Sequence, residues 1–94
     1  MSFKVLDFYA DWCQPCKTVS KEIESLEETY SKYITKINIE DDENDVSSKY
    51  FIRSIPTLVF ILNDKEVFRQ VGTITAARLK NLIDRYKTEI KPKI

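Results

Sequence analysis

The chain has 94 residues, of which 43% are apolar, and its 15 Lys and Arg balance 15 Asp and Glu to give zero formal net charge. This length and composition fit a single soluble globular domain over residues 1–94, and zero net charge argues against a nucleic-acid partner. The apolar runs are too short to span a membrane and the N-terminus does not resemble a signal peptide, so we expect a cytoplasmic protein with no membrane partner.

Several kinds of active site are excluded by the residue types that are scarce. Histidine is absent, which removes Ser-His-Asp triads, Cys-His nucleophile pairs and histidine-based metal sites. Gly72 is the only glycine, so the chain has no glycine-rich phosphate loop. Two cysteines without a second pair or a histidine do not make a zinc site or a disulfide framework, and we expect no bound metal.

The first half of the chain alternates between strand and helix patterns. Residues 4–10 are rich in strand formers and predict a buried strand. A long helix is predicted next, because apolar residues at spacings of three and four share one face. These residues are Cys16, Val19, Ile23, Leu26 and Tyr30. Residues 34–40 alternate and predict a second strand, and the acidic loop 41–45 leads into a short helix over residues 46–51.

The second half predicts a hairpin and a last helix. The apolar run 57–62 is typical of a central strand covered on both faces, and the turn signal at 63–65 leads into another strand over 66–71. A helix starts at about Thr75, and residues 91–93 are expected to fray. The order predicts an α/β fold: a mixed sheet of about four strands between helices, with its first two strands parallel.

Cys13 and Cys16 lie between the first predicted strand and the long helix, separated by Gln14 and Pro15. A C-x-x-C motif beside a strand–helix unit is typical of a dithiol redox site. The N-terminal end of the helix favours a thiolate on the first cysteine, and Pro15 fits the first helical turn. We therefore expect Cys13 to attack a disulfide and Cys16, one turn further in, to resolve the mixed disulfide. Two buried thiols without redox chemistry are the alternative.

Three segments together resemble the thioredoxin family. FYADWCQPCK (8–17) resembles its active-site segment, IRSIPT (52–57) resembles its cis-proline segment, and Val71-Gly72 resembles the position of its late glycine. They keep the family's order along nearly the whole chain. The resemblance implies a minimal thioredoxin fold, strand–helix–strand–helix–strand–strand–helix, that lacks the family's usual N-terminal strand and helix.

The resemblance also implies roles for two charged residues. Asp7 matches a buried acid that accepts the proton of the resolving Cys16, and Lys36 matches the lysine that approaches this acid. Asp7 also interrupts an apolar strand, and a buried carboxylate needs a partner or a raised pKa, which supports the match independently. The alternatives are an acid turned to solvent at an edge position and a plain surface lysine.

A substrate-binding surface is implied by the same resemblance. The Ile55–Pro56 bond is expected to be cis, with the backbone of Ile55 bonding an extended substrate; a trans turn proline is the alternative. Gly72 would admit a substrate backbone, or else serve a tight turn. Trp12 would be an exposed contact beside Cys13, or else a packing aromatic. The remaining aromatics are expected in the core: Phe8, Tyr30, Phe51 and Phe60.

These features predict a monomeric protein-disulfide reductase with no bound cofactor. Disulfide-containing proteins would be its substrates, and the family implies reduction by thioredoxin reductase at the expense of NADPH. Two other hypotheses stay open: a glutaredoxin-like, glutathione-dependent enzyme, and a non-catalytic docking module on a larger protein. Gln14 replaces the family's usual glycine between the cysteines and is expected to tune the redox potential. Lys21 stands where the family often has a helix-kinking proline, which predicts a straighter helix.

Overall fold

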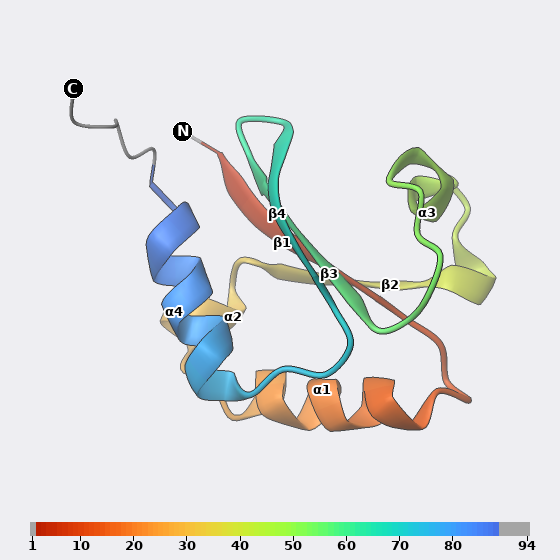
Figure 1. Ribbon diagram of the computed structural model, residues 1–94, viewed down its shortest axis with the longest axis horizontal. Coiled ribbons are helices and arrows are strands. Elements are labelled where there is room, and N and C mark those ends of the chain that lie inside the picture. The colour runs from red at the N-terminus through yellow and green to blue at the C-terminus, as the bar shows by residue number, and fades with distance from the viewer. Residues whose placement is uncertain (1, 89–94) are drawn as a thin grey trace.

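The computed structural model describes residues 2–88, which form a four-stranded sheet with helices on both faces (Figure 1). The strand order is β2-β1-β3-β4, so β1 (Phe3–Tyr9) and β3 (Thr57–Leu62) are the inner strands. The edge strands are β2 (Ile34–Asn38) and β4 (Lys65–Val71). β1 pairs with β2 in parallel, whereas β1 with β3 and β3 with β4 are antiparallel. The predicted mixed sheet is confirmed.

The helical elements connect these strands in the predicted order. They are α1 (Gln14–Glu24), α2 (Glu28–Ser31), the 3-10 turn η1 (Ile39–Asp41), α3 (Val46–Lys49) and α4 (Ala76–Tyr86). Within residues 2–88, none of the helices has the length and apolar character that crossing a membrane requires. The predicted fraying of residues 91–93 lies outside the described residues.

The single long helix predicted after the cysteines is wrong, because the helical pattern divides into α1 and α2. The hydroxyl of Ser25 donates to the carbonyl of Glu22 at 2.7 Å, and Glu27 has an extended backbone with φ −65° and ψ 153°. The periodicity nevertheless continues across this break, since Leu26 and Tyr30 still pack against the core. Apolar spacing alone therefore did not indicate where the helix ends.

Each face of the sheet carries its own apolar core. The core between the sheet and the helices α1 and α4 contains Val5, Val19, Ile23, Leu58, Phe60, Ile74, Leu79, Leu82 and Ile83. The opposite face, toward α3, buries Leu6, Phe8, Val59 and Ile61. β1 and β3 contribute alternate residues to both cores, as expected for strands covered on both faces. Among the aromatics expected in the core, Phe51 is an exception, because 78% of it is exposed.

Hydrogen bonds to two polar side chains shape the segment between β2 and α3. Asn38 ends β2 earlier than predicted, because its side chain accepts the N–H of Glu40 at 2.9 Å and residues 39–41 form η1. The backbone N–H groups of Ser47 and Val46 donate to the carboxylate of Asp42 at 2.7 and 3.0 Å, and these bonds lower the pKa of Asp42. Asp42 thereby fixes the start of α3, the helix that covers the second core.

Candidate active site

Cys13 and Cys16 form a disulfide at the N-terminal end of α1, with their Cα atoms 5.2 Å apart. Cys13 is the residue that precedes the helix, and its Sγ accepts the N–H of Cys16 at 3.2 Å. Pro15 lies in the first turn, where a missing N–H leaves no gap in the helical hydrogen bonds. The helix thus directs an N–H group and the positive end of its dipole at the Cys13 sulfur, which favours the thiolate.

The disulfide is largely covered by apolar neighbours. Cys13 and Cys16 are each 4% exposed and form a cluster with Ala10, while Gln14 and Pro15 between them are exposed. Partly buried side chains complete this cluster: Tyr9, Ile39 and Ile55. In the described part of the chain, no group of three or more His, Cys, Asp and Glu side chains is arranged to hold a metal ion.

Asp7 is buried in β1, with 1% of its surface exposed, so it is not an acid turned to solvent. Among residues 2–88 nothing donates a hydrogen bond to its buried Oδ1. Burial raises the pKa of Asp7 from 3.8 to about 6, because the carboxylate loses hydration, and the charge of Lys36 opposes this rise. A carboxyl group with this pKa can change its protonation state near neutral pH.

Lys36 lies beside Asp7 in the sheet register but does not form an ion pair with it within the described residues. Its Nζ donates to Ser20 Oγ at 2.8 Å and lies 4.8 Å from the centre of the Tyr9 ring. These groups and Cys16 line one cavity of about 170 Å³, whose other lining residues are Ala10, Asp11 and Lys17. This cavity is large enough to hold water beside Cys16.

Two special backbone conformations occur in segments that are joined to each other, at Ile55–Pro56 and at Gly72. The Ile55–Pro56 peptide bond is cis, as the resemblance implied, and Ile55 packs against the cysteine cluster. The carbonyl of Pro56 accepts the N–H of Gly72 at 2.9 Å, which joins the cis-proline segment to the end of β4. Gly72 has φ 95°, a conformation that side chains disfavour, and no atom lies within 4 Å of the place its Cβ would occupy. The backbone conformation therefore explains why position 72 is a glycine, and the space that a side chain would occupy there is open.

Trp12 is 65% exposed, so it is not an ordinary packing aromatic. Its Nε1 donates to Glu40 Oε2 at 2.8 Å, which holds the ring against η1. The indole borders a groove of about 490 Å³ that is lined by Trp12, Ile39, Ser47, Ile52, Arg53, Ser54 and Ile55. Glu40 was not among the predicted site residues. The sequence predicts Glu40 as the last residue of the second strand, and the available signal was its place next to the acidic loop 41–45.

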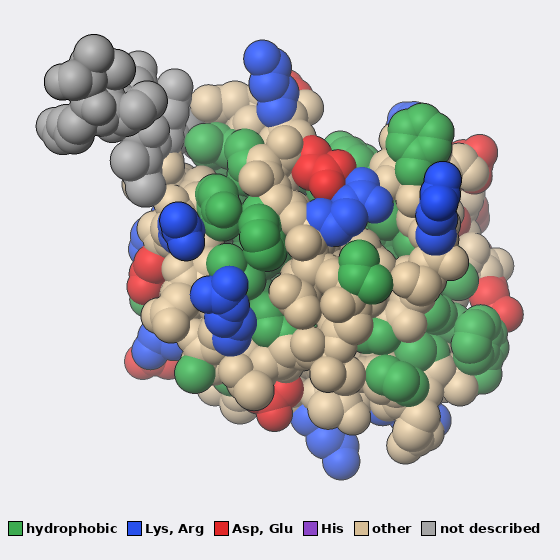
Figure 2. Space-filling model, viewed as in Figure 1, with side chains coloured by type: hydrophobic (Ala, Val, Ile, Leu, Met, Phe, Trp, Pro, Cys, Tyr) green, Lys and Arg blue, Asp and Glu red, His purple; other side chains and the backbone are tan. Residues whose placement is uncertain are grey.

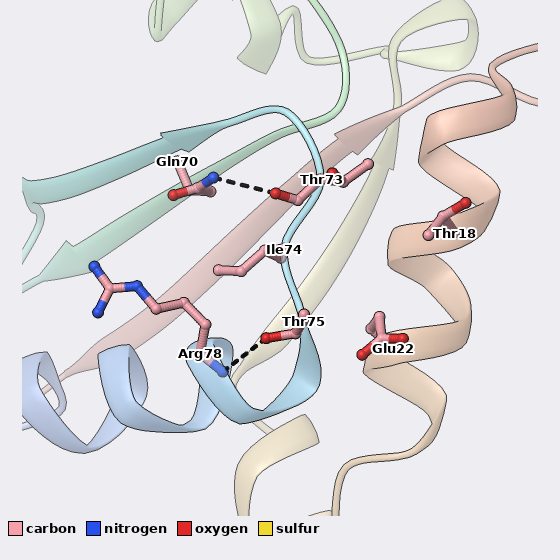
Figure 3. A pocket seen from close by; sticks show the side chains of 7 residues that line it. All are labelled: Thr18, Glu22, Gln70, Thr73, Ile74, Thr75 and Arg78. Carbon is pink, nitrogen blue, oxygen red and sulfur yellow. Dashed lines mark hydrogen bonds between the residues drawn. The ribbon is translucent and has the colours of Figure 1, made fainter.

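A further pocket, of about 360 Å³, lies between α1 and the start of α4 (Figure 3). Glu22 of α1 accepts the N–H of Ala76 at 2.6 Å, and Thr75 Oγ1 accepts the N–H of Arg78 at 3.2 Å. These bonds satisfy N–H groups at the start of α4 and tie that helix to α1. They also fix the segment that follows Gly72 relative to the helix that carries the disulfide.

A disulfide at a helix N-terminus, with a cis-proline beside it and a buried acid in the adjoining strand, is the arrangement of a dithiol–disulfide oxidoreductase.

The comparisons with known proteins agree with this class. The thioredoxin family model matches residues 2–85. Thioredoxin 1 of Synechococcus elongatus is 35% identical over 83 residues, covering 87% of this chain and 78% of its own length. Thioredoxin of Chlamydia caviae is 42% identical over 83 residues, covering 87% and 80%. The solved structure of a mutant thioredoxin from Halobacterium salinarum NRC-1 has a TM-score of 0.81 at 36% identity, covering 96% of this chain and 78% of that chain.

The chain belongs to the thioredoxin family and is a protein-disulfide oxidoreductase. Members of this family need no bound cofactor for this chemistry, because the two cysteines supply both electrons.

Replacing Asp7 by asparagine is expected to stabilise the oxidised protein at neutral and alkaline pH. Because the pKa of Asp7 is raised to about 6 in the folded state, the native protein binds this proton more tightly than the unfolded chain does. The contribution of Asp7 to stability therefore falls as the pH rises from 3.8 to about 6 and then stays constant. At pH 8 the ionised group should lower the free energy of unfolding by about 3 kcal/mol.

Urea unfolding of wild type and Asp7→Asn at several pH values measures this difference. The two proteins should be similar near pH 4 and diverge by about 3 kcal/mol at pH 8. An equal pH dependence of the two proteins would contradict the burial of an ionisable Asp7.

Proposed function

We propose that this protein reduces the disulfides of other proteins by two successive thiol–disulfide exchanges. The observation that carries the proposal is the hydrogen bond from the N–H of Cys16 to the sulfur of Cys13, because it favours a thiolate on Cys13. The Cys13 thiolate attacks one sulfur of the substrate disulfide, forms a mixed disulfide and releases the other substrate sulfur as a thiolate. The Cys16 thiolate then attacks the Cys13 sulfur and expels the second substrate thiolate. Two electrons pass to the substrate, and the Cys13–Cys16 disulfide remains.

In this scheme Asp7 accepts the proton that Cys16 must lose before it attacks. The proposal is supported by the burial of Asp7 in the strand that leads to the cysteines and by its raised pKa of about 6. Lys36 acts as the partner of the acid through its charge, which opposes the rise in the pKa of Asp7 and so leaves most of the population ionised at pH 7. Its contacts to Ser20 and Tyr9 hold this charge near the cavity.

The substrate is proposed to bind in an extended conformation across the disulfide. The backbone of Ile55 before the cis Pro56 offers hydrogen bonds of the kind that a neighbouring strand makes. Trp12 supplies an exposed apolar contact, and the open space beside Gly72 would admit a substrate backbone. Gln14 and Pro15 form the exposed turn between the cysteines, where they influence the redox potential.

The oxidised protein must be reduced again after each turnover. We infer that thioredoxin reductase performs this step with electrons from NADPH, because membership of the thioredoxin family implies that partner. We further propose that the protein acts in the cytoplasm. We propose that it is a monomer and that residues 1–94 form one thioredoxin-like domain.

The Cys16→Ser variant should accumulate the mixed disulfide. Without the resolving thiol, Cys13 can attack the substrate but cannot release it, so a covalent complex should form and turnover should stop. Non-reducing electrophoresis and mass spectrometry of the variant with insulin would detect the complex. The matched control is Cys13→Ser, which should form no complex.

Other outcomes distinguish the remaining hypotheses. A Cys16→Ser variant that still turns over with glutathione would favour the glutaredoxin-like enzyme. Biological function that survives loss of both thiols would favour the docking module. A mixed disulfide between the substrate and Cys16 in the Cys13→Ser variant would contradict the proposed order of attack.

The role of Asp7 predicts a pH-dependent rate. In wild type, the rate of the resolving step should rise through a pKa of about 6 as Asp7 ionises. Asp7→Asn should lack this rise and should resolve the mixed disulfide roughly 100-fold more slowly at pH 7, since it cannot accept a proton. Stopped-flow measurement of substrate release across this pH range tests it. A variant with the wild-type profile would remove Asp7 from the mechanism.

A further inference from the structure

Phe51 follows α3 and is placed where neither packing nor backbone geometry favours it. It is 78% exposed, more than any other large apolar side chain among residues 2–88, and it belongs to neither apolar core. Its φ of 54° lies in the left-handed region, which is costly for a bulky side chain and which glycine adopts freely. Because the fold gains little from this exposed ring and its backbone is strained, the side chain is a candidate for a function outside the fold.

The surface beside Phe51 is continuous with the active-site groove. Phe51 lines a groove of about 430 Å³ together with Ser47, Ser48, Ile52 and Arg53. Three of these residues also line the groove that Trp12 and Ile55 border: Ser47, Ile52 and Arg53. The two grooves therefore adjoin, and we call them together the α3 groove. Figure 2 shows hydrophobic side chains on the side of the molecule that carries α3 and the start of α1.

The α3 groove combines apolar surface with one available cation. Arg53 lies between the two parts of the groove, is exposed, and forms no ion pair within residues 2–88. At the end nearest the disulfide, the indole N–H of Trp12 is already satisfied by Glu40. A peptide segment that fits this surface therefore carries an apolar side chain for Ile52 and Phe51, and a carboxylate for Arg53.

We propose that Phe51 determines substrate specificity by binding an apolar side chain of the substrate segment that flanks the reacting disulfide. The occupant is a disulfide-containing protein because the α3 groove begins at Ile55, which packs against Cys13 and Cys16, and a molecule joined to Cys13 extends into the nearest groove. Aromatic side chains at the end of such a groove are common anchors for protein partners. This inference rests on the proposed function and names the kind of protein disulfide that the site prefers: one flanked by apolar and acidic residues.

The test compares a protein disulfide with a small one in variants that keep the backbone conformation. Phe51→Gly and Phe51→Asn both tolerate φ 54°, so they should fold as well as wild type. We expect kcat/KM for insulin to fall about fivefold in both variants, mainly through a higher KM. The rate with the small disulfide dithiobis-nitrobenzoate should stay unchanged, because it does not reach Phe51. Phe51→Tyr should retain the wild-type KM.

Val67→Thr is the matched control, because Val67 is also an exposed apolar residue but lies on β4 outside the α3 groove. This variant should keep the wild-type KM for insulin. Unchanged insulin kinetics in Phe51→Gly would overturn the inference, and so would equal losses with both disulfides, which indicate a structural role. A wild-type dimer that dissociates in Phe51→Gly would also overturn it, by assigning Phe51 to a contact between copies. Failure of wild type to reduce either disulfide would instead overturn the proposed function.

Discussion

The hydrogen bond from the N–H of Cys16 to the sulfur of Cys13 is the contact on which the rest of the site depends. It makes a redox sulfur the cap of α1, so the start of the helix and the position of the reactive group are set together. Val19 and Ile23 anchor α1 in the core, and Glu22 ties it to the start of α4. The core thus positions the helix, and the helix places Cys13 beside Ile55 of the cis-proline segment.

Asp7 shows what this arrangement costs in stability. An acid in an inner strand, with 1% of its surface exposed and without a hydrogen bond to Oδ1 from the described residues, opposes folding whenever it is ionised. Its raised pKa places the change of charge near neutral pH, where the proposed mechanism has Asp7 accept the proton of Cys16. The same burial that lowers stability therefore makes the carboxylate suitable as a base. Lys36 moderates this burial penalty without forming a direct bond.

Much of the fold followed from the sequence because the strands have unmistakable apolar patterns and the redox motif stands at a strand–helix junction. The break between α1 and α2 could not be predicted, since it depends on the local hydrogen bonds of Ser25 while the apolar spacing continues past it. Phe51 was expected in the core because it is a large apolar residue. The sequence does not show that its backbone takes a positive φ and that its ring is exposed. The bond between Trp12 and Glu40 was missed for a similar reason: it joins residues that only the folded sheet brings together.

We propose that the start of α1 makes Cys13, and not Cys16, the nucleophile. The most direct measurement treats the reduced protein with limiting iodoacetamide at pH 7 and locates the label by mass spectrometry of the proteolytic peptides. We expect Cys13 to be alkylated first and Cys16 only slowly, because the helix N-terminus stabilises the Cys13 thiolate. Equal labelling of the two cysteines, or faster labelling of Cys16, would contradict it.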